Sequence, residues 1–186
     1  APRQRNTREE NKKIKEGKGD ELWNDQPKKK RHKDIDAKWT KKNNETFYGY
    51  KDHAKVDTNS KFIDKYKVTD ASVHDSQVLD DLLTEEDKGQ NLYADSAYTG
   101  EEQEKVIEKY EMNNQVNEKA YRNKPLTEKQ KNSNRKKSKT RARVEHIFGF
   151  MEQSMNGLAI KSVGIVRATS IIGLINLTYN LFRYEQ

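Results

Sequence analysis

The sequence has 186 residues, about the length of one domain. Only 31% of them are hydrophobic and 36% are charged, against roughly 45–50% apolar residues in an average globular domain. There is no cysteine, which excludes disulfide bonds and thiolate metal sites. The start lacks the apolar segment of a signal peptide, and the longest uncharged run, residues 168–182, is shorter than a membrane span of roughly 20 residues. We therefore expect a soluble protein of the cytoplasm, with no membrane partner.

The charged residues fall into blocks along the chain. The net charge is +7 overall, but it is +6 over residues 1–46, −8 over residues 47–117 and +8 over residues 118–145. An acidic block between two basic blocks suits a metal-dependent enzyme that acts on nucleic acid, because carboxylates bind cations and Lys and Arg neutralise phosphates. A solvated surface with uneven charge explains the same pattern equally well.

Residues 1–46 contain few large apolar side chains, namely Ile14, Leu22, Trp23, Ile35 and Trp39. A segment of this composition cannot bury enough apolar surface to offset the entropy lost on ordering. We predict a basic, weakly ordered arm or insertion over residues 1–46 and a folded domain over residues 47–186. The two tryptophans lie among lysines, so they could stack on nucleic-acid bases or pack the arm against the domain.

Two strands and a helix are predicted next. The alternation of Tyr48, Tyr50, Ala54 and Val56 is typical of a strand over residues 47–57, and a second strand is predicted over residues 62–70. Asn59-Ser60 between them favours a turn, so the two strands should form an antiparallel hairpin. A helix is then expected to start at a capping box of Ser72 and Asp75, with an apolar face made of Val78, Leu79, Leu82 and Leu83.

The segment NLYADSAYTG predicts a short buried strand that ends at Asp95. Thr99 and Glu102 form a second capping box, which predicts a helix lined by Val106, Ile107 and Tyr110, and MNNQVN predicts a further short strand. Residues 118–138 are polar and contain Pro125, and a loop is expected there.

Two helices are predicted at the end of the chain. The first covers about residues 139–155, with an apolar stripe of Val144, Ile147, Phe148 and Met151, and Asn156-Gly157 ends it. The second covers about residues 165–184 and is apolar around most of its circumference, so we expect it to be buried. This order of strands and helices indicates an α/β fold in which helices flank a mixed sheet.

Two carboxylates stand out by position. Asp95 follows a predicted strand, where open α/β sheets bind ligands, but an aspartate there is also a common turn or cap residue. Glu145 lies beside the apolar stripe of its helix, four residues after Arg141, so a solvated ion pair explains it on spacing alone. The histidines show no paired spacing typical of metal ligands, and most are expected at the surface: His32, His53, His74 and His146.

Four segments resemble successive sequence blocks of insertion-sequence DDE transposases, and most closely the bacterial insertion sequence five group. They are VTDASVHDSQ, LYADSAYTG, RARVEHIFG and GIVRATSIIGLINLTYNLFR, and the likeness extends to the opening PRQRNTREEN. The resemblance implies an RNase H-like fold in which two Asp and one Glu hold two divalent ions. It matches Asp95 to the second Asp, Glu145 to the Glu, and Arg141 to the Arg four positions before that Glu.

The sequence departs from the family pattern in two ways. In relatives the first catalytic Asp and its strand precede the segment equivalent to PRQRNTREEN, so we expect both to be missing from this chain. Asp57 is the one internal residue that could take the place of this Asp, and a role in the hairpin turn explains Asp57 better. Relatives also often carry Tyr and Lys near the Arg and Glu, where this sequence has Ser138 and Glu152.

The resemblance implies metal-dependent cleavage and strand transfer of DNA ends, with Mg²⁺ or Mn²⁺ in a two-ion site. The expected partner is double-stranded DNA, both element ends and target, bound near the bacterial nucleoid; a homo-oligomer on DNA is an open possibility. Asp95 and Glu145 are the expected catalytic and metal-binding residues. A non-catalytic DNA-binding remnant and a nuclease of the same fold are the alternatives. The expected DNA-binding residues are Arg135, Lys136, Lys137, Lys139, Arg141 and Arg143.

Overall fold

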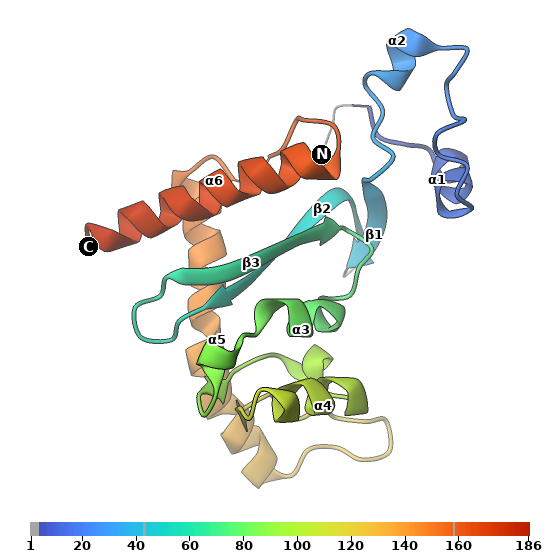
Figure 1. The fold of residues 1–186 in the computed structure, drawn as a ribbon. Helices are drawn as coiled ribbons and strands as arrows, with labels where there is room; N and C mark the ends of the chain where they lie inside the picture. Colours follow the sequence, from blue (N-terminus) through green and yellow to red (C-terminus); the bar gives the residue numbers. More distant parts are fainter. Residues whose placement is uncertain (1–3, 43, 158) are drawn as a thin grey trace.

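The computed structural model describes residues 4–42, 44–157 and 159–186 of the chain. Figure 1 shows a three-stranded sheet between two groups of helices, with α6 over one face and α3 and α4 on the side of the other face. Long α5 passes beside the sheet and joins the two groups. The expected α/β class, with helices flanking a sheet, is confirmed, but the three-stranded sheet is antiparallel throughout and not mixed.

The central sheet contains β1 (Lys38–Lys42), β2 (Glu45–Val56) and β3 (Ile63–Asp70), paired antiparallel in the order β1-β2-β3. The predicted hairpin is therefore confirmed as β2 and β3. Asp57 shapes its turn, because its carboxylate accepts hydrogen bonds from the backbone amides of Asn59 and Ser60 at 3.1 and 2.6 Å. A hydrogen bond from the Ser60 hydroxyl at 2.6 Å, and then these backbone hydrogen bonds, lower the pKa of Asp57.

The two faces of β2 carry different chemistry because side chains alternate along a strand. Ala54 and Val56 pack into an apolar cluster with α5 and α6. Lys51, His53 and Lys55 belong to the opposite face, where their partners lie around α3. The hairpin thus separates an apolar core from a charged layer.

Helix α6 (Ile165–Tyr184) has the bounds expected from the sequence, but the expectation that it is buried is wrong. Only one face is buried, and its residues are Ala168, Ile172, Asn176 and Tyr179. The helix lies close to β3: the Tyr66 hydroxyl occupies the place that a Cβ at Gly173 would take. By length and apolar composition α6 would also pass as a membrane span, a test that the core helices of soluble proteins pass too.

Helix α5 (Glu128–Ser154) begins well before the expected start near residue 139, so the loop predicted up to residue 138 is wrong beyond Thr127. The early start has a local cause. Thr127 accepts a hydrogen bond from the Gln130 amide, and the Gln130 side chain accepts one from the Thr127 amide, which forms a complete capping box. Asn156 and Gly157, both with positive φ, end the helix as expected.

The second layer contains η1 (Asp75–Val78), α3 (Leu79–Leu82), η2 (Glu85–Asp87), β4 (Asn91–Leu92), η3 (Ser96–Tyr98), α4 (Glu101–Lys109) and β5 (Asn113–Asn114). Strands β4 and β5 pair in parallel, and the expected apolar residues form a core of Leu79, Leu83, Ile107 and Val116. Two predicted helix starts are wrong: His74 rather than Ser72 caps η1, and Gly100 rather than Thr99 precedes α4.

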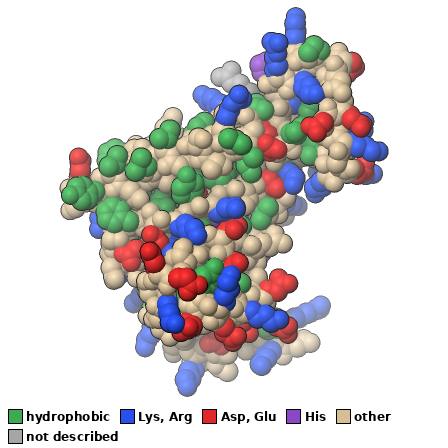
Figure 2. Space-filling view, in the orientation of Figure 1, with side chains coloured by type: hydrophobic (Ala, Val, Ile, Leu, Met, Phe, Trp, Pro, Cys, Tyr) green, Lys and Arg blue, Asp and Glu red, His purple; other side chains and the backbone are tan. Residues whose placement is uncertain are grey.

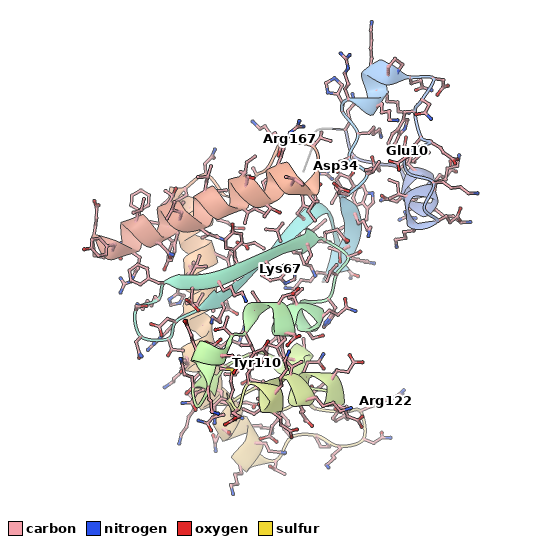
Figure 3. The ribbon with its side chains drawn as sticks, in the orientation of Figure 1. Glu10, Asp34, Lys67, Tyr110, Arg122 and Arg167 are labelled. Atoms are coloured by element: carbon pink, nitrogen blue, oxygen red, sulfur yellow. The ribbon has the colours of Figure 1, made fainter. Side chains whose placement is uncertain are left out.

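The segment that precedes β2 contains α1 (Arg8–Lys15), α2 (Pro27–Lys30) and β1, which pairs with β2. Asp34 is fully buried where this segment meets the rest of the molecule (Figure 3). Its carboxylate accepts hydrogen bonds from the Tyr50 hydroxyl at 2.7 Å and from the Gly164 amide at 3.0 Å. Trp23 is buried against Glu10 and Lys33 of the same segment, whereas the ring of Trp39 lies 5.0 Å from that of Tyr48 in β2. The division of the chain at residue 46 stays a prediction.

Candidate functional site

Asp95 lies directly before η3, at the end of the short segment that continues from β4. One of its carboxylate oxygens accepts a hydrogen bond from the Ala97 amide at 2.8 Å, so it caps the turn. The strand is shorter than expected and ends at Leu92. Asp95 thus has the turn-capping role that the sequence allowed and lies three residues beyond the end of the strand, while its role as a ligand stays a prediction. Its side chain remains partly exposed.

A cluster of charged side chains lies beside the Asp95 loop, and we define it as Lys51, His53 and Asp75. The Asp75 carboxylate is 3.4 Å from His53 Nδ1 and 3.3 Å from Lys51 Nζ. Burial lowers the pKa of His53, an effect that the Asp75 charge partly offsets. Most of the histidines are exposed, as expected, but the imidazole of His53 is buried and hydrogen-bonded to the Thr69 hydroxyl at 2.8 Å.

One hydrogen bond and one shared electrostatic effect relate this cluster to the Asp95 loop. Gln103 of α4 donates a hydrogen bond to the Ser76 carbonyl, which joins η1 to the helix after the Asp95 loop. Burial and then the negative charges of Asp75 and Asp95 raise the pKa of the Tyr98 phenol, so both carboxylates lie near that ring. The spacing of Lys51 and His53 on one strand face is the only signal in the sequence that could have indicated the cluster.

Glu145 projects from α5, with 60% of its side chain exposed. It forms an ion pair with Arg141 at 2.8 Å, as the spacing of four residues predicts. Ile147 and Met151 of the same helix are buried in the core. The apolar stripe therefore anchors α5, while Glu145 stays available to a ligand.

Asn117 connects the Asp95 segment to α5. Its backbone amide donates to the Ala94 carbonyl at 3.0 Å, one residue before Asp95, and its side chain donates to the Ser138 hydroxyl at 3.0 Å. Ser138 and Glu145 are seven residues apart, so they share one face of the helix and lie about 10 Å apart along it. The fold thus turns the Glu145 face of α5 toward the segment that carries Asp95.

The basic residues of α5 occupy two different faces. Arg135, Lys136, Lys139 and Arg143 lie within one arc of about 100° by helical spacing, and we call this arc the basic ridge. The other two expected DNA-binding residues lie on the Glu145 side, where Lys137 donates to the Val116 carbonyl and Arg141 pairs with Glu145. The ridge is therefore the freer of the two basic faces.

Asp95 and Glu145 supply two carboxylates with oxygen ligands of the kind that Mg²⁺ and Mn²⁺ prefer. Within the parts of the chain that the structure describes, no group of three or more His, Cys, Asp or Glu side chains is placed to hold a metal ion. The described residues therefore offer carboxylates of the chemistry that such an ion prefers but no assembled ligand set, and the role of Asp95 and Glu145 as ligands stays a prediction.

A family model described as a transposase DDE domain matches residues 17–181, and the chain belongs to that family. The transposase for insertion sequence element IS1106 of Neisseria meningitidis serogroup B is similar to it, with 33% identity over 151 residues. This match covers 81% of the chain and 52% of the relative, so the chain spans about half the relative's length. No solved structure matches the chain.

Proposed function

We propose that this chain is a DNA-processing part of an insertion-sequence transposase, in which Asp95 and Glu145 contribute ligands to a divalent-ion site. The reaction is the cleavage of DNA at the element ends and the joining of those ends to a target. The Asn117 bridge is the observation that carries the proposal, because it sets the loop of Asp95 against the α5 face that carries Glu145. Membership of the DDE family supports the same assignment.

Each group has a distinct part in this proposal. Bound Mg²⁺ or Mn²⁺ would supply activation of the attacking oxygen and stabilisation of the leaving oxygen. Asp95, from a loop, and Glu145, from a helix, would hold that ion. Arg141 keeps Glu145 oriented through their ion pair, and the basic ridge neutralises phosphates of the bound duplex.

The first test is Mn²⁺ binding by calorimetry. Asp95→Asn and Glu145→Gln should each weaken Mn²⁺ binding by about tenfold or more, because each removes one charged ligand. Glu128→Gln is the matched control: Glu128 is also an exposed α5 glutamate, and it pairs with Lys131 as Glu145 pairs with Arg141. Wild-type affinity in both site variants would rule out the proposed ligands.

Strand joining separates this proposal from the nuclease alternative. A transposase joins a cut element end to target DNA, whereas a nuclease of the same fold releases cut DNA without joining it. The assay is a labelled element end incubated with a target plasmid in Mn²⁺ and the whole protein. Cleavage without any joined product would favour the nuclease.

A further inference from the structure

Helix α6 exposes a row of large apolar side chains on the face away from the sheet. Figure 2 shows hydrophobic side chains following one another along this helix. The exposed fractions are high for residues of this type: Val166 77%, Leu174 63%, Leu177 54%, Leu181 59% and Tyr184 81%. Isolated apolar residues at a surface are ordinary, but a continuous row along one helix marks an interaction surface.

The row has the spacing of a helix-pairing seam. Ser170, Leu174, Leu177, Leu181 and Tyr184 are separated by 4, 3, 4 and 3 residues, which is the repeat of the a and d positions in a coiled coil. We call these five residues the α6 seam. They fall within an arc of about 80° on the helix, and the buried residues lie on the opposite side. So narrow a stripe fits a second helix better than a broad flat partner.

The α6 seam matches an antiparallel copy of itself. When two copies are aligned about the midpoint between Leu174 and Leu177, Leu174 of one copy lies against Leu177 of the other. The same alignment sets Ser170 against Leu181. Every a position then meets a d position, which is the pairing that antiparallel helices require.

The ends of the helix are complementary in the same alignment. Arg167 is exposed at the start of α6, and Tyr184 and Glu185 are exposed at its end. Antiparallel pairing brings Arg167 of each copy to Tyr184 and Glu185 of the other, where a cation–π contact and an ion pair can form twice. A parallel pair would instead place the two arginines together at one end.

We propose that the α6 seam is a dimerisation surface, on which a second copy of this chain docks through its own α6 in antiparallel orientation. The buried face of α6 stays on the sheet, held by the hydrogen bonds of Asn180 to the Ile63 backbone. The seam is about 21 Å long. A standard stable interface buries roughly 800 Å² per partner, and this one consists of a single helix face, so we expect the dimer to form at high protein concentration and to dissociate on dilution.

The test is sedimentation velocity over a wide range of protein concentration. The wild-type chain should shift from monomer to dimer as concentration rises. Leu174→Glu with Leu177→Glu should remain monomeric, because it places four carboxylates at the centre of the pair. Both positions are exposed, so the fold should survive, and circular dichroism checks this. Tyr121→Glu is the matched control, an equally exposed residue outside α6, and it should dimerise as wild type does.

Orientation is tested by cross-linking, which is unambiguous because the natural chain has no cysteine. A Ser170→Cys chain mixed with a Leu181→Cys chain should form a mixed disulfide dimer far more efficiently than either chain alone. In addition, Arg167→Glu should weaken the dimer, and Glu185→Arg added to it should restore the association.

Three results would overturn the proposal. The first is a wild-type chain that stays monomeric at every concentration. The second is a dimer that the Leu174→Glu, Leu177→Glu variant leaves unchanged. The third is binding of a monomeric wild-type chain to phospholipid vesicles that this variant abolishes, which would assign the seam to a membrane surface.

Discussion

At the scale of single residues, the buried carboxylate of Asp52 is in an energetically unfavourable environment. Its side chain lies between β2 and α6, and neither carboxylate oxygen has a hydrogen-bond partner among the described residues. Both polar atoms of the neighbouring Asn176 amide are also buried and unpaired there. Burial raises the pKa of Asp52 to about 6, and the nearby Asn176 amide offsets only part of this effect.

This raised pKa makes the stability of the fold depend on pH. Because the pKa of Asp52 is higher in the folded than in the unfolded chain, the contribution of Asp52 to the free energy of unfolding is most favourable below about pH 4 and is lost as the pH rises through about 6. Asp52→Asn should therefore raise the free energy of unfolding near neutral pH by on the order of 2 kcal/mol. The measurement is urea unfolding of both proteins from acidic to neutral pH.

The advantage of Asp52→Asn should disappear at the acidic end of that range, where wild-type Asp52 is neutral. Asp25→Asn serves as the control, because Asp25 is exposed and its replacement should change stability little at any pH. An Asp52→Asn protein that is less stable than wild type near neutral pH would show that the ionised carboxylate has a stabilising partner.

At the scale of elements, the basic ridge of α5 is expected to provide most of the DNA affinity. Replacing Arg135, Lys136 and Lys139 with Ala should weaken binding to all DNA sequences alike. The slope of log affinity against log salt should flatten by about 0.9 for each phosphate that the variant no longer neutralises. Fluorescence anisotropy with a labelled duplex measures both quantities over a series of salt concentrations.

The control for that experiment removes the same charge from another helix. Lys12, Lys13 and Lys15 are exposed on α1, so changing all three to Ala lowers the net charge equally. This control should leave most of the salt slope in place. Equal effects of the two triple variants would mean that DNA responds to total charge and not to the ridge.

The elements that the sequence predicted correctly are those with a strong apolar period. The β2–β3 hairpin and both bounds of α6 follow from such patterns. The first turns of α5, up to residue 138, have no apolar stripe, and the capping box of Thr127 and Gln130 is the local signal that the prediction missed. The exposure of α6 was not predictable, because an apolar seam and a buried surface have the same composition.

The candidate site was predicted only in part for a similar reason. Asp95 and Glu145 could be selected from the sequence blocks in which they lie. The Lys51, His53 and Asp75 cluster depends on contacts between residues 22 and 24 positions apart, such as those of Lys51 with Val73 and Asp75. Local periodicity carries no information about such pairings.

At the scale of the whole molecule, we expect this chain alone to bind DNA without cleaving it. Two carboxylates of the described residues, Asp95 and Glu145, match the family pattern, whereas the family resemblance implies three carboxylates around two ions. A gel-shift assay and a plasmid-nicking assay in Mn²⁺ measure the two activities in parallel. Nicking by the chain alone that Asp95→Asn abolishes would contradict this expectation.

The start of α6 depends on residues that lie far away in the sequence. Gly164 precedes the helix and has no side chain with which to cap it, so Asp34 accepts from the Gly164 amide and Asp36 from the Ile165 amide at 2.9 Å. These contacts close loops of 130 and 129 residues. During synthesis α6 emerges after the other described elements, so the buried carboxylate of Asp34 lacks its helix partner until 130 further residues have been made. Late loop closure of this kind slows folding, and a ribosome-bound chain that ends before residue 164 should leave the segment that precedes β2 open to proteases.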